Sequence, residues 1–133
     1  MKKQYFKIIS GLFVIMMFQL GCDTNTTGAQ PTGMANEFQI HLQTWYAQTP
    51  VIVAIDNVQV FSDTISTGSI IGIAAVVSPK VTNGTHSLRV TIANAISKDT
   101  TFTIQDTLYI SANYNSQNSQ IIYYFTRNRF LYD

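Results

Sequence analysis

Period-two alternation of apolar and polar residues constrains the fold of this chain more than any other feature. In residues 38–43 every second residue is apolar, and residues 87–92 repeat the pattern. This alternation is typical of strands that bury one face. Residues 51–55 and 70–77 are instead apolar and rich in β-branched residues, as expected of strands with little solvent contact. No convincing helical period follows residue 36, so strands dominate the expected fold.

Turn signals divide these runs into short strands. Asp56-Asn57 predicts a tight hairpin because both residues tolerate positive φ, and Asn83-Gly84 is the strongest turn signal in the chain. Further breaks are expected at residues 62–68, at Lys98-Asp99, at Asp106 and at residues 115–119. The predicted strands are residues 38–43, 51–55, 58–61, 70–77, 87–92, 100–104, 108–112 and 121–125. We therefore predict an all-β fold, a small antiparallel β-sandwich of about 7–8 strands spanning residues 37–133.

The first 21 residues are typical of a secretory signal peptide rather than of the folded domain. Lys2, Lys3 and Lys7 precede an apolar run at residues 8–18, and polar sequence begins directly after Cys22. The apolar run is too short to be a favourable membrane span, which needs about 20 residues. We expect a signal peptide over residues 1–21 in an N-terminal helix.

The only cysteine of the chain stands where cleavage is expected. Leu20-Gly21-Cys22 resembles the lipobox of bacterial lipoproteins, although Gln19 holds the place where that family usually has Leu. The resemblance implies that Cys22 is acylated and anchors the protein to a membrane of the bacterial cell envelope. An unpaired thiol would also be unusual in an oxidising envelope. The alternative is an ordinary secreted protein whose cysteine is incidental.

The segment after the cysteine is expected to be a flexible tether. Residues 22–36 are small and polar, with Gly28, Pro31 and Gly33 among them. Asp23 resembles an inner-membrane retention signal in enterobacteria and a surface-export signal in Bacteroidota. The outer membrane or the cell surface is the favoured location over the inner membrane.

Composition and charge exclude several classes of protein. Apolar residues make up 46% of the chain and charged residues 11%, which is unlike a disordered chain. Without the three lysines of the signal peptide, five basic residues face seven acidic ones, a net charge of −2. A mildly acidic domain lacks the electrostatic footprint of a nucleic-acid binder, so no nucleic acid is expected as a partner.

Two segments resemble a known domain family. Residues 51–60 (VIVAIDNVQV) and residues 81–90 (VTNGTHSLRV) are similar to PEGA-type and related immunoglobulin-like domains, small β-sandwiches of surface and envelope proteins. The likeness covers roughly residues 51–112, although Asn57 stands where Gly is usual and the Pro-Glu-Gly-Ala segment is absent. It implies a binding or scaffolding module without enzymatic activity.

No motif points to catalysis, to a metal or to a cofactor. His41 and His86 lie on different predicted strands without ligand spacing, and no Gly-x-Ser-x-Gly nucleophile motif is present. Most acidic residues stand at turns, where Asp is favoured by backbone geometry. His41 is expected to face solvent and His86 to pack at the start of a strand. We therefore expect no catalytic residues, no metal ligands and no enzyme activity.

Aromatic residues offer the one candidate binding surface. Trp45 and Tyr46 follow the first strand, while Tyr124 is expected to be exposed beside Arg127 and Arg129 at the end of the chain. Aromatic and arginine side chains are enriched at protein interfaces, and aromatic faces also stack on sugars. The favoured interpretation is docking of another envelope protein on the last strand and tail. The alternative is glycan binding through Trp45 and Tyr46, and ordinary core packing is a third explanation.

Alternation in the last strand would bury Tyr123 and Phe125 and expose Tyr124. Three Asp-Thr steps also resemble the envelope O-glycosylation sequon of Bacteroidota, which implies modification at Thr64, Thr100 and Thr107. The same step is common wherever a turn leads into a strand.

Overall fold

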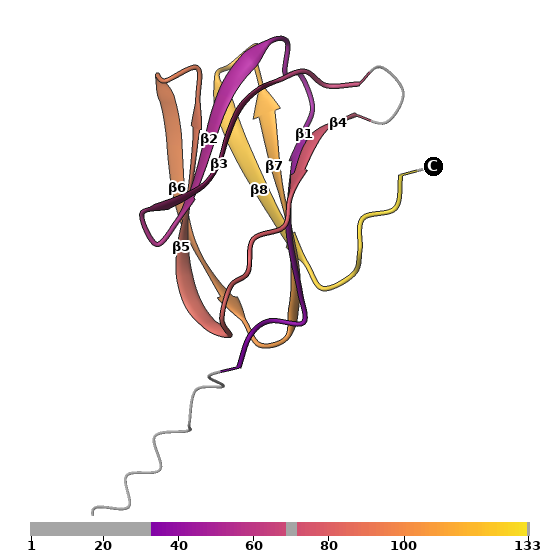
Figure 1. Ribbon diagram of the computed structural model, residues 1–133. Coiled ribbons are helices and arrows are strands. Elements are labelled where there is room, and N and C mark those ends of the chain that lie inside the picture. Colours follow the sequence, from indigo (N-terminus) through magenta and orange to yellow (C-terminus); the bar gives the residue numbers. More distant parts are fainter. Residues whose placement is uncertain (1–32, 69–71, 133) are drawn as a thin grey trace, which may run out of the picture.

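The computed structural model describes residues 33–68 and 72–132, which form eight strands and contain no helix (Figure 1). The predicted all-β sandwich is confirmed. The signal peptide, Cys22 and residues 23–32 lie outside the described residues, and no membrane-spanning helix occurs within the described part. The strands are β1 (Glu37–Gln43), β2 (Thr49–Ile55), β3 (Val58–Ile65), β4 (Ile73–Val77), β5 (Gly84–Ile92), β6 (Ile96–Ile104), β7 (Thr107–Asn115) and β8 (Gln120–Thr126).

One sheet has the strand order β4-β1-β7-β8 and contains the single parallel pair of the described structure, β1 with β7. The amide of Asn36 donates to the carbonyl of Asp106 at 2.9 Å, so both strands leave the same end of the sandwich. The other pairs in this sheet are antiparallel. The expectation of antiparallel strands is therefore right for every neighbouring pair but this one.

The other sheet has the order β3-β2-β5-β6 and is antiparallel throughout. The predicted β2–β3 hairpin is confirmed: Asp56 and Asn57 have φ of 50° and 65° between the paired residues Ile55 and Val58. Two adjacent residues with positive φ match the right-handed twist of the flanking strands.

The predicted turn at Lys98-Asp99 is wrong. Both residues lie inside β6, where they pair with Val90 and Arg89 of β5. The chain reverses earlier, at residues 93–95, where Ala93 adopts a φ of 52°. Alanine seldom takes this left-handed conformation and gives no turn signal, whereas the next residue, Asn94 with a φ of 55°, tolerates it.

Two other predicted boundaries also move. β3 continues through the predicted loop at 62–68 to Ile65, which is 6% exposed against the core. Asn83-Gly84 closes no hairpin, because it links β4 in one sheet to β5 in the other. β4 begins only at Ile73, and residues 69–71 lie outside the described residues.

The core lies between the two sheets and is built from the inward-facing residues of alternating strands. Phe38 of β1 and Phe102 of β6 stack with ring centroids 5.3 Å apart. Their stacking joins the two sheets near the end at which the chain enters β1. The fully enclosed apolar side chains are Ile40, Leu42, Val53, Leu88, Val90, Ile92, Ile110 and Ala112, each 0% exposed.

Residues 33–36, expected to belong to the tether, are hydrogen-bonded to the domain. Met34 forms an isolated antiparallel bridge with Thr82, and the amide of Ala35 donates to the carbonyl of Val81 at 3.0 Å. The ordered domain thus starts before the first strand.

Candidate interaction surface

The free edge of β8 is the most unusual surface of the described structure. We call residues 121–125 the β8 edge; their sequence is Ile-Ile-Tyr-Tyr-Phe, with no charge and no proline. β8 pairs with β7 in an unbroken register and ends the strand order of its sheet. Edge strands of soluble proteins are usually blunted by charges, prolines or bulges, because free backbone groups recruit other strands.

Two side chains of the β8 edge, Ile122 and Tyr124, are exposed on the outer face of the sheet, whereas Ile121 is 2% exposed in the core. Tyr124 is 55% exposed, as expected, and Ile122 is 37% exposed. Phe125, expected to be buried, is 45% exposed at the second-to-last position of β8. This edge therefore presents apolar and aromatic side chains beside free backbone groups.

Lys98 is the one charged residue that reaches the β8 edge among the described residues. Its Nζ donates to the carbonyl of Ile121 at 2.7 Å, and the hydroxyl of Tyr123 donates to the Lys98 carbonyl at 2.7 Å. Backbone groups alternate in direction along a strand. The carbonyls of Tyr123 and Phe125 therefore point to the same free side as that of Ile121.

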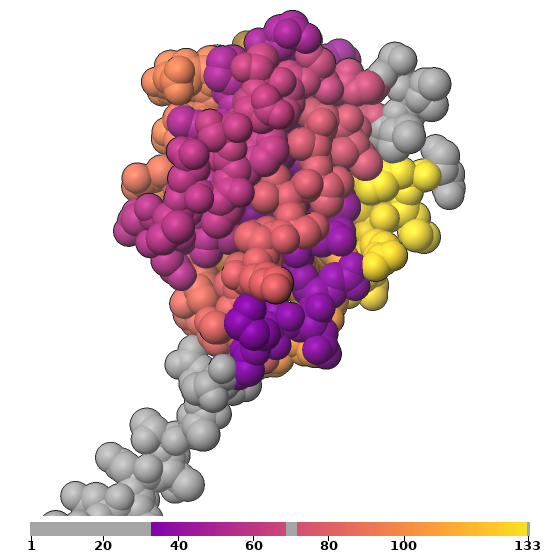
Figure 2. Space-filling view, in the orientation of Figure 1, coloured from indigo at the N-terminus to yellow at the C-terminus, as the bar shows by residue number. Residues whose placement is uncertain are grey.

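The end of the chain folds back over the outer face of the same sheet. We call residues 127–132 the terminal strap; Figures 1 and 2 show it, in yellow, leaving β8 and lying against the body of the domain. Arg129 donates to Glu37 of β1 at 2.6 Å, and Arg127 makes a 3.5 Å contact with Gln105. The two arginines expected to face a partner thus contact the domain itself.

His41 lies beneath the terminal strap, so the expectation that it faces solvent is wrong. It projects from the outer face of β1 yet is only 3% exposed. The ring of Phe130 lies 4.9 Å away, edge-on, and that of Tyr132 stacks at 5.7 Å. Burial lowers the pKa of His41 from its ordinary 6.5, because the charged ring loses water. Local alternation cannot reveal a cover that comes from a distant segment.

Trp45 and Tyr46 are adjacent in sequence but point to different environments. Trp45 is 71% exposed, whereas Tyr46 is 3% exposed in the core and donates its hydroxyl to the carbonyl of Ala112 at 3.3 Å. Burial raises the pKa of Tyr46 well above its usual range. Trp45 stands at the far end of β1 from Arg129, so the structure does not gather the predicted binding residues into one site.

The loop that carries Trp45 is strained and firmly attached. Thr44, Trp45 and Gln48 have φ of 63°, 44° and 48°, a conformation that costs roughly 1–2 kcal/mol for each L-residue. The hydroxyl of Thr44 donates to the carbonyl of Tyr114 at 3.1 Å, and the amide of Gln48 donates to Ser66 Oγ at 2.9 Å. The exposed indole is thus held on a rigid loop.

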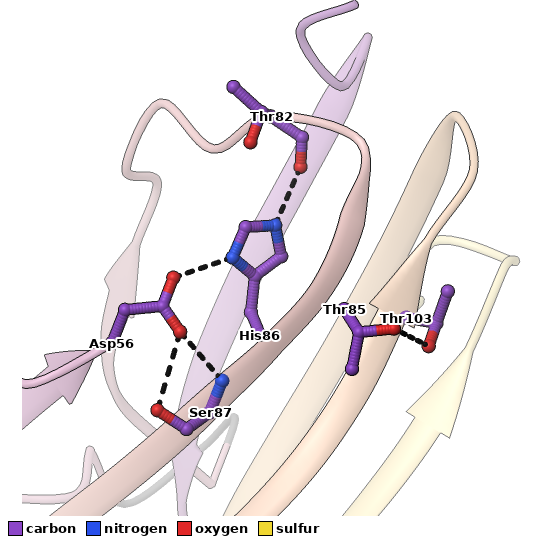
Figure 3. Close-up of polar contacts among 6 residues, drawn as sticks. All are labelled: Asp56, Thr82, Thr85, His86, Ser87 and Thr103. Atoms are coloured by element: carbon purple, nitrogen blue, oxygen red, sulfur yellow. Dashed lines mark hydrogen bonds and ion pairs between the residues drawn. The ribbon is translucent and has the colours of Figure 1, made fainter. Parts of the chain in front are cut away.

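Asp56, His86 and Ser87 meet at the start of β5 (Figure 3) but do not form a catalytic triad. His86 Nδ1 lies 2.6 Å from Asp56, while Nε2 lies 2.9 Å from the carbonyl of Thr82. Ser87 Oγ contacts Asp56 at 3.3 Å instead of a ring nitrogen. A triad needs an imidazole nitrogen free to take the serine proton, and here both nitrogens face other acceptors. The cluster therefore joins the β2–β3 turn to β5, and His86 packs near the strand start, as expected.

The three candidate O-glycosylation residues differ in accessibility. Thr64 of β3 is exposed, and its amide donates to Asp63 Oδ1 at 2.7 Å. Thr100, within β6, and Thr107, at the start of β7, are both half-buried. Thr64 is therefore the most accessible of the three.

Within residues 33–68 and 72–132, no group of three or more His, Cys, Asp or Glu side chains is arranged to hold a metal ion. The described part of the chain is a small all-β sandwich whose β8 edge is its candidate interaction surface. No family model matches the sequence, and no curated protein or solved structure matches it significantly.

Proposed function

We propose that this protein is a non-catalytic lipoprotein of the bacterial cell envelope whose β-sandwich binds another envelope protein. In this proposal Cys22 is acylated and anchors the protein to the membrane, and the β8 edge binds the partner protein. The PEGA-like segments of the sequence support a binding or scaffolding role.

The exposed, uncharged β8 edge is the observation that carries the binding part of the proposal. Tyr124 and Ile122 project outward beside free backbone groups on one strand. A partner strand added here gains main-chain hydrogen bonds from the edge and side-chain contacts from the aromatic face. Tyrosine is also among the residues that contribute most to binding energy when an interface buries them.

Crosslinking and recovery from intact cells tests this surface. The full chain carries a C-terminal tag, and co-purified proteins are identified by mass spectrometry. We expect one envelope protein in near-stoichiometric amount from the wild type, and at least tenfold less from the double variant Ile122→Lys, Tyr124→Glu. Both substituted side chains are exposed, so the domain remains folded.

Thr101→Lys is the matched control for this experiment. Thr101 is exposed on β6, in the opposite sheet, so a charge there leaves recovery unchanged. Equal recovery of the partner by the wild type and the double variant would show that the β8 edge is not part of the interface. Loss in the control as well would indicate a nonspecific effect of charge and contradict the proposed surface.

The anchor is tested separately by Cys22→Ser. We expect the wild type in the membrane fraction and labelled by a fatty-acid analogue, and the variant unlabelled and released from the membrane. Equal labelling of the two chains would contradict acylation at Cys22.

Glycan binding through Trp45 is a second candidate, favoured by the 71% exposure of this indole on its rigid loop. Rigid aromatic faces stack on sugar rings without losing much conformational entropy. Trp45→Ala is expected to abolish retention on a polysaccharide array, with Leu131→Ala, also exposed, as the control. Unchanged retention of Trp45→Ala would exclude this site.

A further inference from the structure

Three residues on the outer face of the β4-β1-β7-β8 sheet are buried where solvent is expected. His41 and Tyr109 are each 3% exposed, and Ser111 is 2% exposed. Alternation places them opposite the core-facing residues of β1 and β7. Phe130 lies 4.9 Å from His41 and 6.4 Å from Tyr109, ring centroid to centroid. The terminal strap is therefore the cover that buries this face.

Side chains alone hold the strap. Among the described residues, no backbone–backbone hydrogen bond joins residues 127–132 to the sheets. The attachment consists of the Arg129–Glu37 ion pair, the Arg127 contact with Gln105, and the aromatic and hydroxyl contacts at His41. A segment without ladder hydrogen bonds can leave the surface without breaking the sheet.

The hydrogen bonds around His41 are complete in its neutral form. Gln43 Nε2 donates to the Tyr132 hydroxyl at 2.5 Å, and that hydroxyl, also 2.5 Å from His41 Nδ1, donates to it when the ring is neutral. On the other side of the ring, Nε2 lies 3.0 Å from Gln39 Oε1 and donates to it. Each polar atom in the row of hydrogen bonds from Gln43 through Tyr132 and His41 to Gln39 has a partner when Nδ1 is an acceptor.

A proton on Nδ1 disrupts this arrangement. Nδ1–H and the Gln43 amide would both point at the Tyr132 oxygen, whose own hydrogen would lose its acceptor. The imidazolium, 3% exposed beneath the strap, also carries a desolvation cost. Opening the strap removes this cost because it returns His41 to water.

We propose that residues 127–132 form a proton-released strap, in which protonation of His41 breaks its contact with Tyr132 and uncovers the outer face of β1 and β7. This inference does not rest on the proposed function. Release exposes Tyr109 and Ser111 beside Tyr124, which is already exposed on the neighbouring strand. Mild acid thus enlarges the aromatic surface of this sheet.

The pH range follows from the groups that face His41. These are Gln39 and Gln43 on β1, Tyr109 and Ser111 on β7, Val76 on β4, and Phe130 and Tyr132 on the strap. The tyrosines remain neutral in mild acid. The charged groups among the strap contacts, Glu37 and Arg129, form an ion pair. Hydrogen bonds from Tyr109 and Arg129 lower the pKa of Glu37 below its ordinary 4.5, so this pair persists while His41 titrates.

The sign of the effect follows from linkage. The pKa of His41 is lowered by burial when the strap is closed and returns toward the ordinary 6.5 when the strap opens. The strap-closing equilibrium constant is therefore largest above pH 6.5. It falls as the pH drops below that value, because the open form binds the proton at a higher pH than the closed form does. Each unit of difference between the two pKa values corresponds to a tenfold change in the strap-closing equilibrium constant.

The test is an NMR titration of the two histidines in the full chain. We compare the wild type with a variant truncated after Thr126 and with Tyr132→Phe. His41 is expected to titrate at lower pH in the wild type than in the truncated variant, with Tyr132→Phe between them. His86 lies in the other sheet and serves as the internal reference.

The strap itself supplies a second readout. Its backbone resonances are expected to move toward random-coil positions over the pH range in which His41 titrates, while those of β7 stay unchanged. In His41→Gln this transition disappears, and Tyr124→Phe, which removes a hydroxyl elsewhere on the same face, behaves like the wild type. An identical His41 titration with and without the strap would overturn the proposal. So would a strap that stays ordered after His41 is protonated.

Discussion

The hydroxyl oxygen of Tyr132 lies 2.5 Å from Nδ1 of His41, a residue 91 positions earlier in the chain. This contact holds the terminal strap against β1, an inner strand of the β4-β1-β7-β8 sheet. It turns a position that alternation marks as solvent-facing into a buried one, 3% exposed. Long-range covering of this kind makes a surface histidine sensitive to the position of a distant segment.

Removing the Tyr46 hydroxyl is expected to destabilise the domain. In Tyr46→Phe the hydrogen bond to the Ala112 carbonyl is lost from the core, which costs about 1 kcal/mol in the free energy of unfolding. Urea denaturation measures the change. Tyr124→Phe removes an exposed hydroxyl and should shift the free energy by less than about 0.5 kcal/mol. Equal losses in the two variants would contradict the structural role of the buried hydroxyl.

Glycine at position 93 is expected to stabilise the β5–β6 turn. Ala93 has a φ of 52°, a conformation that glycine adopts without a Cβ penalty. The hydrogen bond from the amide of residue 93 to the Pro50 carbonyl is retained in the variant. Thermal or urea unfolding of Ala93→Gly should show a gain of roughly 0.5–1 kcal/mol. Ala95→Gly, also exposed in this turn but without positive φ, should lose stability. A loss in both variants would show that the strain at Ala93 is not relieved.

Removal of the Lys98 ammonium group is expected to promote self-association. Lys98→Met deletes the hydrogen bond to the Ile121 carbonyl and leaves the β8 edge without its one charged neighbour. Light scattering coupled to size-exclusion chromatography should show oligomers at concentrations where the wild type shows none. Lys80→Met removes an exposed lysine elsewhere and serves as the control. Oligomers in the control but not in Lys98→Met would contradict protection of the edge by Lys98.

Acid is expected to weaken the link between the β2–β3 turn and β5. The hydrogen bond from His86, followed by that from the Ser87 amide, holds the pKa of Asp56 below its ordinary 3.8. The carboxylate therefore adds stability above pH 3.8, and this contribution is lost as the pH falls through the lower, folded-state pKa. Because Asp56 is 50% exposed, solvent screening keeps the effect small.

Unfolding curves measured from pH 7 to pH 2 check this prediction. Asp56→Asn should reduce the acid-dependent loss of stability, whereas Asp63→Asn should change it less. An identical acid profile for the wild type and Asp56→Asn would show that the carboxylate contributes nothing.

Local pattern predicted the strands well because alternation and short turns are encoded within a few residues. The Asp56-Asn57 hairpin is an example, since its backbone preference belongs to the two residues themselves. The turn at Ala93 was missed because tertiary pairing imposes a conformation that alanine disfavours. The parallel β1–β7 pair was missed for a similar reason, since it joins strands far apart in the sequence.

The candidate surface was only partly predictable. Tyr124 is exposed because alternation along β8 is local, whereas the burial of Tyr46 and His41 depends on Ala112 and Tyr132, far away in the chain. The sequence names the chemistry that these side chains offer. Which of them meet solvent is decided by which distant segment covers them.

The parallel pairing of β1 with β7 has a mechanical consequence. β1 is the first strand, and it is paired along its whole length with β7 on one side and, over residues 40–43, with β4 on the other. Tension applied through the upstream chain runs along the strand axis, across hydrogen bonds that are slanted toward β7 and nearly perpendicular toward β4. These bonds are loaded together in shear and cannot open one after another like a zipper. A domain pulled from this end resists extension with both flanking ladders at once.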